Sequence, residues 1–527
     1  MDKAETRKAE ASVYGLLSPV RFVSAAWFAL MAVGALRAAE PPAALPPFAV
    51  ARLGRLGADA PLTGIYGIAF APDGRQLATR GADQIVRVWD VAASKQLTAI
   101  DGHRDRVQAL AYSLDGKVLA TCSEGEDPAV RFWDPATGKM ARQAAIGANL
   151  LQYLPPGQTL LGVSRTNATM LNIAGDAISV KQLPGGAPVA ISGDGTLIAF
   201  VDSVQGLRLC SATTGVPGPN LRALGAPPIS AAFSPDNSYL AGGTLRENSV
   251  QLWDLRRGVL HIVLAGHMGP VQAVAFSPDS RHLATASWDK TVRIWELATR
   301  RPVAVLEGHQ DHVCAVAFSS DGRQLASGAA GADDTTALIW DARKVLYPAR
   351  QDVSKLDPAG QDILLRNLSA DDPATAYPAI GSLLSSPATA QRLLASGLGE
   401  KGKKSGEEAI RLLLKQLDDD DFTIREAAHK QLFELRPGAD ALLRATLTTT
   451  PSAEVRHRIE QILEKPLGAK TPVSDADRRW LSRAVLTLEL IADADAIKLL
   501  SGIAQQPGGE PHVAEAVGAL KRLGAAK

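Results

Sequence analysis

The sequence predicts a mainly β fold, a radial array of seven short-stranded units, followed by an all-α region. Three observations lead to this fold class. A tight turn centred on Asp-Gly, or on a close variant of it, returns about every forty residues up to about residue 345. A Trp-Asp or Trp-Glu pair closes most of these units. After Tyr347 the apolar period changes from two, typical of strands, to 3.6, typical of helices.

The turns lie between runs of alternating apolar residues and are the most regular part of each unit. Asp and Gly supply the hydrogen bonding and the positive φ that a hairpin needs. The copies are Pro72-Asp73-Gly74, Leu114-Asp115-Gly116, Gly193-Asp194-Gly195, Pro235-Asp236-Asn237, Pro278-Asp279-Ser280, Ser320-Asp321-Gly322 and a weaker one at 155–157. Their repetition indicates a ring of similar units rather than a series of independent domains.

The beginnings and ends of the units carry a second signature. The closing pairs are Trp89-Asp90, Trp133-Asp134, Trp253-Asp254, Trp295-Glu296 and Trp340-Asp341, and the opening pairs are Gly102-His103, Gly266-His267 and Gly308-His309. In this order and period, the pattern resembles the WD40 repeat family over residues 48–345. The resemblance implies a seven-bladed β-propeller.

In that family a His, an Asp and a Trp of one blade share buried hydrogen bonds, which are tolerable in the core because the groups satisfy one another. The resemblance implies the trios His103/Asp127/Trp133, His267/Asp289/Trp295 and His309/Asp334/Trp340. Thr285 or Ser287 is expected to add a hydroxyl to the second trio. The third and fourth units depart from the pattern, since Ile173 and Cys210 stand near the place of Trp.

A propeller must close its ring, and members of the family do so with a strand from the N-terminal side. Residues 48–53, Phe-Ala-Val-Ala-Arg-Leu, precede the first full unit and have the right length for a strand. We therefore predict that they complete the last blade.

The N-terminal 39 residues have the order of a secretory signal. Basic residues precede an apolar run over 22–36, and small residues follow it. A cleaved signal, an uncleaved membrane anchor and a cytosolic protein stay open, and we expect an exported, periplasmic or membrane-anchored chain. Residues 40–47 are rich in proline and predict a stiff linker.

Residues 346–356 are expected to link the propeller to an α-helical domain at 357–527. Asp357-Pro358 and Asp372-Pro373 are typical helix starts, and Ser405-Gly406-Glu407-Glu408 has the form of a capping box. Further starts are expected at Asp421 and Ser452. The run at 417–425 resembles the inter-helix Asp and following Arg of HEAT repeats. The whole layout is similar to a group of bacterial WD40 proteins with an export segment and a helical tail.

Composition and small motifs argue against several classes of function. Lys and Arg number 56 and Asp and Glu 55, so the net charge of +1 offers no excess of basic residues for nucleic acid. The three cysteines show neither zinc nor haem spacing. His103-Arg104-Asp105 lacks the remaining kinase motifs, and His309-Gln310-Asp311-His312 lacks a third metal ligand. We predict no catalytic residue, no metal and no cofactor.

Binding remains as the function to predict. In the WD40 family, partners contact the bulge of each inner strand and the residue before the blade Asp. The resemblance implies a partner-binding set of Arg106, Gln108, Glu126, Gln272, Trp288, His312 and Asp333. We expect a non-enzymatic scaffold for one or more proteins, with Trp288 facing out as the main contact. The alternatives are a small ligand in the central channel and a sensor module of a signalling complex.

Overall fold

The chain divides by its internal contacts into two units, Met1–Val345 and Leu346–Lys527. The computed structural model describes residues 44–525 apart from 55–63, 156, 158, 165–167, 173–177, 182–186, 203–205, 213, 350, 420, 435–439, 450–451, 465–474 and 506–510. The predicted signal or anchor at 1–39 therefore lies outside the described residues, as does the first half of the linker at 40–47. Among the described helices, none has the length and apolar composition needed to cross a membrane.

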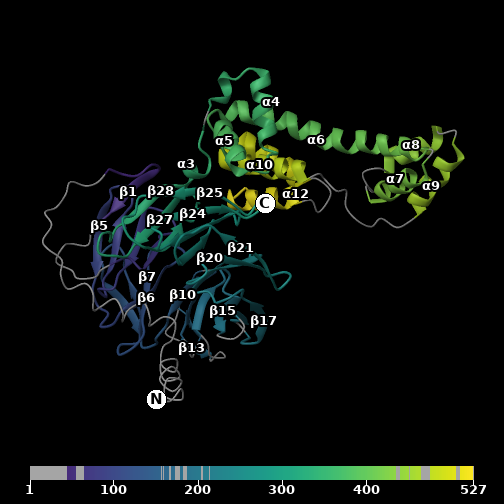
Figure 1. Cartoon of the computed structure of the whole chain (residues 1–527). Coiled ribbons are helices and arrows are strands. Elements are labelled where there is room, and N and C mark those ends of the chain that lie inside the picture. The colour runs from purple at the N-terminus through teal and green to yellow at the C-terminus, as the bar shows by residue number, and fades with distance from the viewer. Residues whose placement is uncertain are drawn as a thin grey trace, which may run out of the picture. The chain divides into compact units, whose positions relative to one another are not determined.

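The first unit consists of seven four-stranded antiparallel sheets, the blades (Figure 1). Blades one to three contain β2 (Gly67–Phe70), β3 (Gln76–Arg80), β4 (Val86–Asp90), β5 (Lys95–Ile100); β6 (Val107–Tyr112), β7 (Leu119–Ser123), β8 (Ala129–Trp133), β9 (Met140–Ala144); β10 (Leu150–Leu154), β11 (Thr159–Val163), β12 (Ala168–Asn172) and β13 (Ile178–Lys181). Blades four and five contain β14 (Ala187–Ile191), β15 (Leu197–Asp202), β16 (Gly206–Ser211), β17 (Pro217–Arg222); β18 (Ser230–Phe233), β19 (Tyr239–Gly243), β20 (Ser249–Asp254) and β21 (Val259–Ala265). Blades six and seven contain β22 (Val271–Phe276), β23 (His282–Ser287), β24 (Val292–Glu296), β25 (Arg301–Leu306); β26 (Val313–Phe318), β27 (Gln324–Ala329), β28 (Ala337–Asp341) and β1 (Ala49–Leu53).

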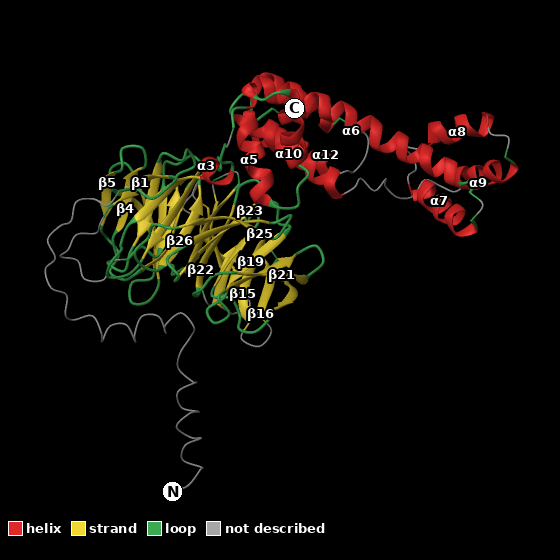
Figure 2. Ribbon diagram, turned by 45° about the horizontal axis from the view of Figure 1, so that its top comes forward, coloured by secondary structure: helices red, strands yellow, loops and turns green. Residues whose placement is uncertain are grey.

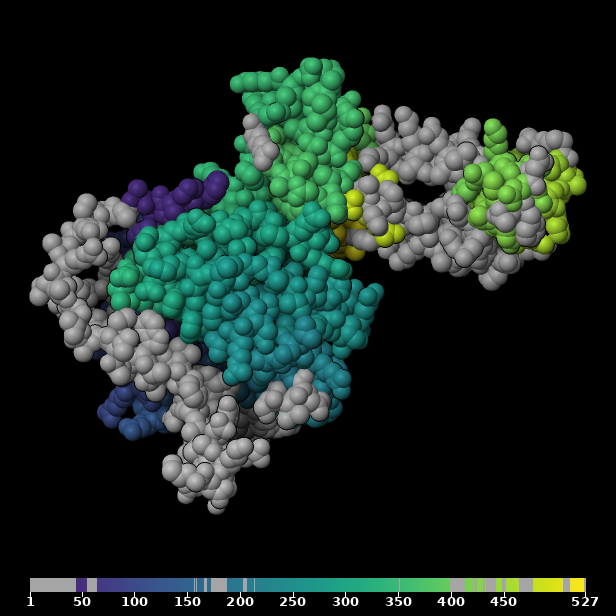
Figure 3. All heavy atoms as spheres, in the orientation of Figure 1, coloured from purple at the N-terminus to yellow at the C-terminus, as the bar shows by residue number. Residues whose placement is uncertain are grey.

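The blades form a closed ring. The innermost strands of successive blades contact one another in chain order, and β26 of the last blade contacts β2 of the first. Figure 2 shows the strands side by side in this array, and Figure 3 shows the side on which the later blades, in teal, form the surface. The third and fourth blades are complete sheets although they lack the Gly-His and Trp-Asp signatures. Ile173 lies outside the described residues, and Cys210 is buried in β16.

Ring closure follows the prediction. β1 pairs antiparallel with β28, with Ala51 opposite Ile339 and Leu53 opposite Ala337. Leu53 is fully buried in a cluster that also contains Trp89 of the first blade. The prediction that residues 48–53 complete the last blade is therefore confirmed, because the N-terminal strand supplies both the missing ladder and the core residues between blades seven and one.

The repeated turn has one geometry, seen in the second blade. Ser113 Oγ donates to Asp115 Oδ1 at 2.7 Å, the same oxygen accepts the Lys117 backbone N–H at 3.1 Å, and Gly116 has a φ of 72°. The Ser-to-Asp bond returns in later blades at Ser192/Asp194, Ser234/Asp236, Ser277/Asp279 and Ser319/Asp321. The hairpin between the two inner strands is thus held by its own side chains, which explains why the sequence period is easy to recognise.

The second unit is helical. Its elements begin with α3 (Ala342–Leu346), which crosses the boundary, and continue with η1 (Val353–Lys355), α4 (Pro358–Asn367), α5 (Pro373–Leu384), α6 (Pro387–Gln416), α7 (Phe422–Glu434), α8 (Asp440–Thr449), α9 (Ala453–Glu464), α10 (Asp475–Ile491), α11 (Ala494–Ala504) and α12 (Pro511–Arg522). Asp357 and Asp372 cap α4 and α5 with their side chains, as predicted. The predicted start at Ser405 is wrong, because α6 runs through it without a break. Ser and Glu are tolerated inside a helix, so the local capping pattern did not decide the boundary.

Candidate partner-binding face of the propeller

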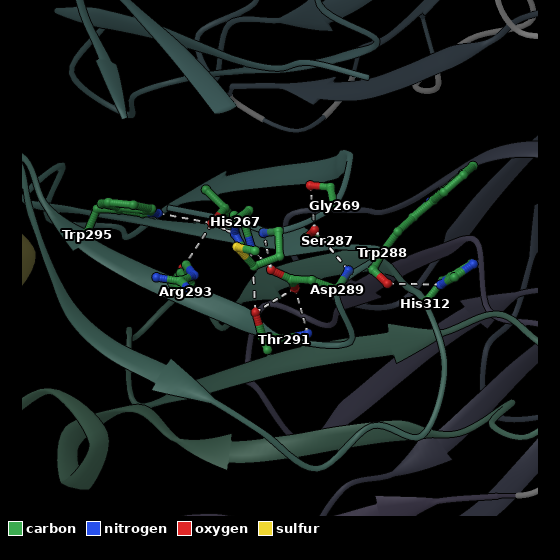
Figure 4. A network of polar contacts seen from close by, with 11 residues as sticks. His267, Gly269, Ser287, Trp288, Asp289, Thr291, Arg293, Trp295 and His312 are labelled. Carbon is green, nitrogen blue, oxygen red and sulfur yellow. Dashed lines mark hydrogen bonds and ion pairs between the residues drawn. The ribbon is translucent and has the colours of Figure 1, made fainter. Parts of the chain in front are cut away.

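The sixth blade contains a complete buried network between its second and third strands (Figure 4). His267 Nδ1 lies 2.8 Å from Asp289 Oδ2, and His267 Nε2 lies 2.7 Å from Thr285 Oγ1. Trp295 Nε1 donates to the same Thr285 oxygen at 3.0 Å. Thr285 is therefore the hydroxyl member, whereas Ser287 Oγ donates to the Gly269 carbonyl at 2.9 Å.

The seventh blade repeats the network with a serine in place of the threonine. His309 joins Asp334 Oδ2 at 2.8 Å and Ser327 Oγ at 2.7 Å, and Trp340 Nε1 donates to Ser327 Oγ at 2.8 Å. Burial by itself would raise the pKa of the Asp334 carboxyl, but the hydrogen bond and charge of His309 together lower it to about 2. Asp334 is consequently a buried anion whose oxygens are all used.

The second blade departs from the expected trio. Arg131 lies between the two expected partners: its Nη1 donates to His103 Nδ1 at 2.7 Å and its Nη2 to Asp127 Oδ2 at 2.7 Å. His103 Nε2 still reaches Thr121 Oγ1 at 2.6 Å, where Trp133 Nε1 also donates at 2.7 Å. The expected direct contact between His103 and Asp127 is thus wrong, because the long guanidinium separates the two groups.

The surroundings of His103 predict that the stability of the protein depends on pH. Burial, and after it the Arg131 charge, lower the pKa of His103 from 6.5 to about 4. As the pH falls, His103 therefore takes up its proton in the unfolded chain before it does so in the folded protein. The contribution of neutral His103 to the free energy of unfolding is complete above pH 6.5 and is lost between about pH 6.5 and 4, by up to about 3 kcal/mol. Urea unfolding of the wild type at pH 7.5 and 4.5 should show this loss. A His103→Gln variant should lose less over the same range, and an identical pH dependence in both proteins would contradict the prediction.

The expected partner-binding residues come from the loops and inner-strand beginnings at one end of the blades, opposite the Asp turns. The register shifts between Val107 and Ala109 and between Val271 and Ala273, so Gln108 and Gln272 are bulge residues. A bulge re-aims a side chain without ending the strand. Glu126 and Asp333 are exposed, and their backbone N–H groups bond Asp105 and Asp311.

Trp288 is half-buried rather than facing out freely. Its ring stacks on His312 of the next blade, with centroids 5.0 Å apart and planes 8° from parallel. His312 Nδ1 lies 3.0 Å from the Trp288 carbonyl oxygen, and Lys290 Nζ donates to the Gln310 carbonyl at 2.7 Å. Figure 4 shows the Trp288 side chain pointing away from the His267 network. The expectation of a free outward aromatic is therefore corrected to an aromatic and imidazole pair that bridges blades six and seven.

Three of the expected residues carry a buried polar atom with no hydrogen-bond partner in the described part of the chain. These atoms are Arg106 Nε, Gln272 Oε1 and Trp288 Nε1. A buried donor or acceptor that stays unpaired costs free energy, and native structures contain few of them. The candidate site is placed at this end because the bulge residues and the stack of Trp288 on His312 lie there.

Three residues near this end were not in the expected set. The first is Tyr66, whose ring centre lies 4.6 Å from Cζ of Arg106. Arg80, at the end of β3, donates from Nη1 to the Val107 carbonyl of the next blade at 3.3 Å. Cys314 occupies in the seventh blade the bulge position that Gln108 and Gln272 hold in theirs. The bulge position of Cys314 is recognisable from the repeat, but nothing in the local pattern marks Tyr66 or Arg80.

The comparison with known families matches the blades directly. The model described as WD domain, G-beta repeat matches residues 57–90, 94–134, 221–254, 258–296 and 300–341. These segments end at the Trp-Asp or Trp-Glu pair of blades one, two, five, six and seven. Five of the seven blades are WD40 repeats. The third and fourth blades complete the WD40 ring without a match of their own.

Relatives of the WD40 propeller occur in several eukaryotic proteins. The chain is 28% identical over 207 residues to Periodic tryptophan protein 2 homolog of Dictyostelium discoideum, covering 39% of this chain and 18% of the relative. It is 27% identical over 236 residues to Transcriptional corepressor LEUNIG_HOMOLOG of Arabidopsis thaliana, covering 43% and 29%. It is 24% identical over 240 residues to THO complex subunit 3 of Arabidopsis thaliana, covering 43% and 74%. The chain thus spans less than a third of the first two relatives.

Proposed function

We propose that this protein is a non-enzymatic scaffold that binds a partner protein on the loop end of its WD40 propeller. The observation that carries the proposal is the stack of the Trp288 ring on His312, which forms an ordered aromatic platform between two blades at the loop end. The names of two relatives, a corepressor and a complex subunit, agree with a role in assemblies.

The Trp288 and His312 pair is the centre of this proposed surface. Its ring area combines an apolar face with one N–H donor, a combination that dominates many protein interfaces. Because the stack joins two blades, the platform is already ordered before binding, which lowers the entropy cost of association.

Replacement of Trp288 by Ala should weaken partner binding by about 2 kcal/mol, or about thirtyfold in Kd. The measurement is affinity capture from native extract followed by titration of the identified partner against both proteins. Leu114→Ala is the matched control, since Leu114 is 47% exposed but lies in a turn at the opposite end of its blade. Equal affinity of wild type and Trp288→Ala would remove this face from the proposal.

The helical unit is proposed as a second, HEAT-like binding surface, supported by the run at 417–425 and by the packing of α6, α7, α8 and α9 around one apolar cluster. Export or anchoring through residues 1–39, and the bacterial layout, likewise remain proposals that rest on the sequence. A partner that is retained by Trp288→Ala but lost on removal of residues 351–527 would assign binding to the helical unit.

A further inference from the structure

Two arginines meet over the innermost strands of blades one and two without an acidic partner. Arg80 bonds only the Val107 carbonyl, and Arg106 lies on the Tyr66 ring. Within the described residues neither guanidinium forms an ion pair or a hydrogen bond with a carboxylate. Paired charges are the usual arrangement for guanidinium groups enclosed by protein, so this pair needs an explanation.

The backbone is shaped to bring Arg80 to this position. Arg80 stands opposite Gly67 in the pairing of β2 and β3. A Cβ atom on Gly67 would lie 2.4 Å from Arg80 Nε and 2.9 Å from its Cζ. Arg80 therefore lies over the innermost strand of its own blade only because residue 67 has no side chain.

Within the described residues, no neighbouring group forms an ion pair with either guanidinium. Burial raises the pKa of the Cys122 and Cys314 thiols to about 12, and it also raises the pKa of the Tyr66 hydroxyl, so all three are neutral at physiological pH. Asp105 carries a negative charge nearby, but its two oxygens accept the backbone N–H groups of Arg106 and Glu126 rather than a guanidinium. Asp311 does the same for His312 and Asp333.

The two guanidinium groups also act on each other. Burial, and after it the charge of Arg106, lower the pKa of Arg80 to about 10. Arg80 stays protonated at neutral pH, but its positive charge is held at a free-energy cost. A bound anion would remove that cost, because it would lie beside both cations.

We propose that Arg80 and Arg106 form a binding site for an oxyanion, a phosphate or a carboxylate group, at the inner rim of the loop end. A guanidinium that stacks on an aromatic ring keeps its N–H edge available for a planar, two-point contact with such a group. The proposal does not depend on a protein partner, since a free anion and an acidic side chain present the same chemistry.

The test is calorimetric titration of the full chain at low salt with pyrophosphate and, separately, with a tetraglutamate peptide. Saturable binding of one anion per chain is expected, and Arg106→Gln and Arg80→Gln should each weaken it at least about tenfold. Stronger binding of pyrophosphate would identify a phosphate site, and stronger binding of the peptide a carboxylate site. Arg75→Gln is the matched control, because it removes the same charge from an exposed turn at the other end of the same blade.

Absence of saturable binding to both anions would overturn the proposal, as would an equal loss of binding in Arg75→Gln. A second readout guards against misfolded variants. Removal of an uncompensated charge should leave the melting temperature of ligand-free Arg106→Gln equal to or above that of the wild type. A clearly lower value would assign Arg106 a structural role and would also count against the site. Either negative result would leave the proposal for the Trp288 surface unchanged, because that surface is tested separately by the binding of a partner protein.

Discussion

Deletion of residues 48–53 should lower the melting temperature of the propeller by about 10 °C or more. The deletion removes β1, exposes the hydrogen-bonding edge of β28 and opens the core between blades seven and one. The deletion removes one strand ladder together with the buried side chains of Ala51 and Leu53. We expect the free energy of unfolding to fall by about 5 kcal/mol, which is comparable with the whole stability of many domains. Differential scanning calorimetry of the deleted and intact proteins measures the effect.

A matched pair of point variants separates ring closure from a general effect of truncation. Leu53 is fully buried, whereas Val50 on the same strand is 49% exposed. Leu53→Ala should cost about 2–5 kcal/mol and Val50→Ala less than about 0.5 kcal/mol. An unchanged melting curve after the deletion, or equal effects of the two point variants, would refute the closing role of β1.

Replacement of Asp334 by Ala should destabilise the seventh blade by about 3–5 kcal/mol. The Asp334 carboxylate accepts hydrogen bonds from His309 Nδ1 and the Gln310 backbone N–H on one oxygen, and from the Thr336 backbone and hydroxyl on the other. The alanine variant leaves all of these buried groups unpaired. Chemical denaturation at pH 7 measures the loss.

The equivalent position in the second blade provides the control. The Asp127 side chain is 26% exposed, against 2% for Asp334, so Asp127→Ala should have a smaller effect than Asp334→Ala. Acid should also weaken the Asp334 contribution. Since the pKa of Asp334 falls from 3.8 to about 2 on folding, its contribution is complete above pH 3.8 and disappears as the pH drops toward 2. Equal losses in the two variants would contradict this account.

Much of the propeller could be predicted because its signals are local. Five hairpin turns bond their own side chains, as Ser113 and Asp115 do, and within each blade consecutive strands pair, apart from the closing strand β1. The blade-six network could be predicted because His267, Thr285 and Trp295 keep the spacing of the repeat. In the helical unit the signals were weaker, since the Ser405 pattern indicated a start inside α6.

The candidate site was predicted less completely, for reasons of geometry. The repeat position of Trp288 was recognisable, but its stacking on His312 depends on how two neighbouring blades approach each other. Arg131 has the length to separate His103 from Asp127, a competition between side chains that spacing does not reveal.

By itself, the sequence determined the seven-bladed ring, its closure by an N-terminal strand and the change to helices after the last blade. The repeats and the change to helices follow from periodicity, whereas the closure of the ring by a distant N-terminal strand was implied by the family resemblance. Only the tertiary structure placed Arg106 on the Tyr66 ring and Arg80 on the Val107 carbonyl next to Arg106 in the chain. The physical reason is that side chains from different blades meet only when the blades pack against each other. Arg80 lies over the inner strand β2 because its partner there, Gly67, has no side chain.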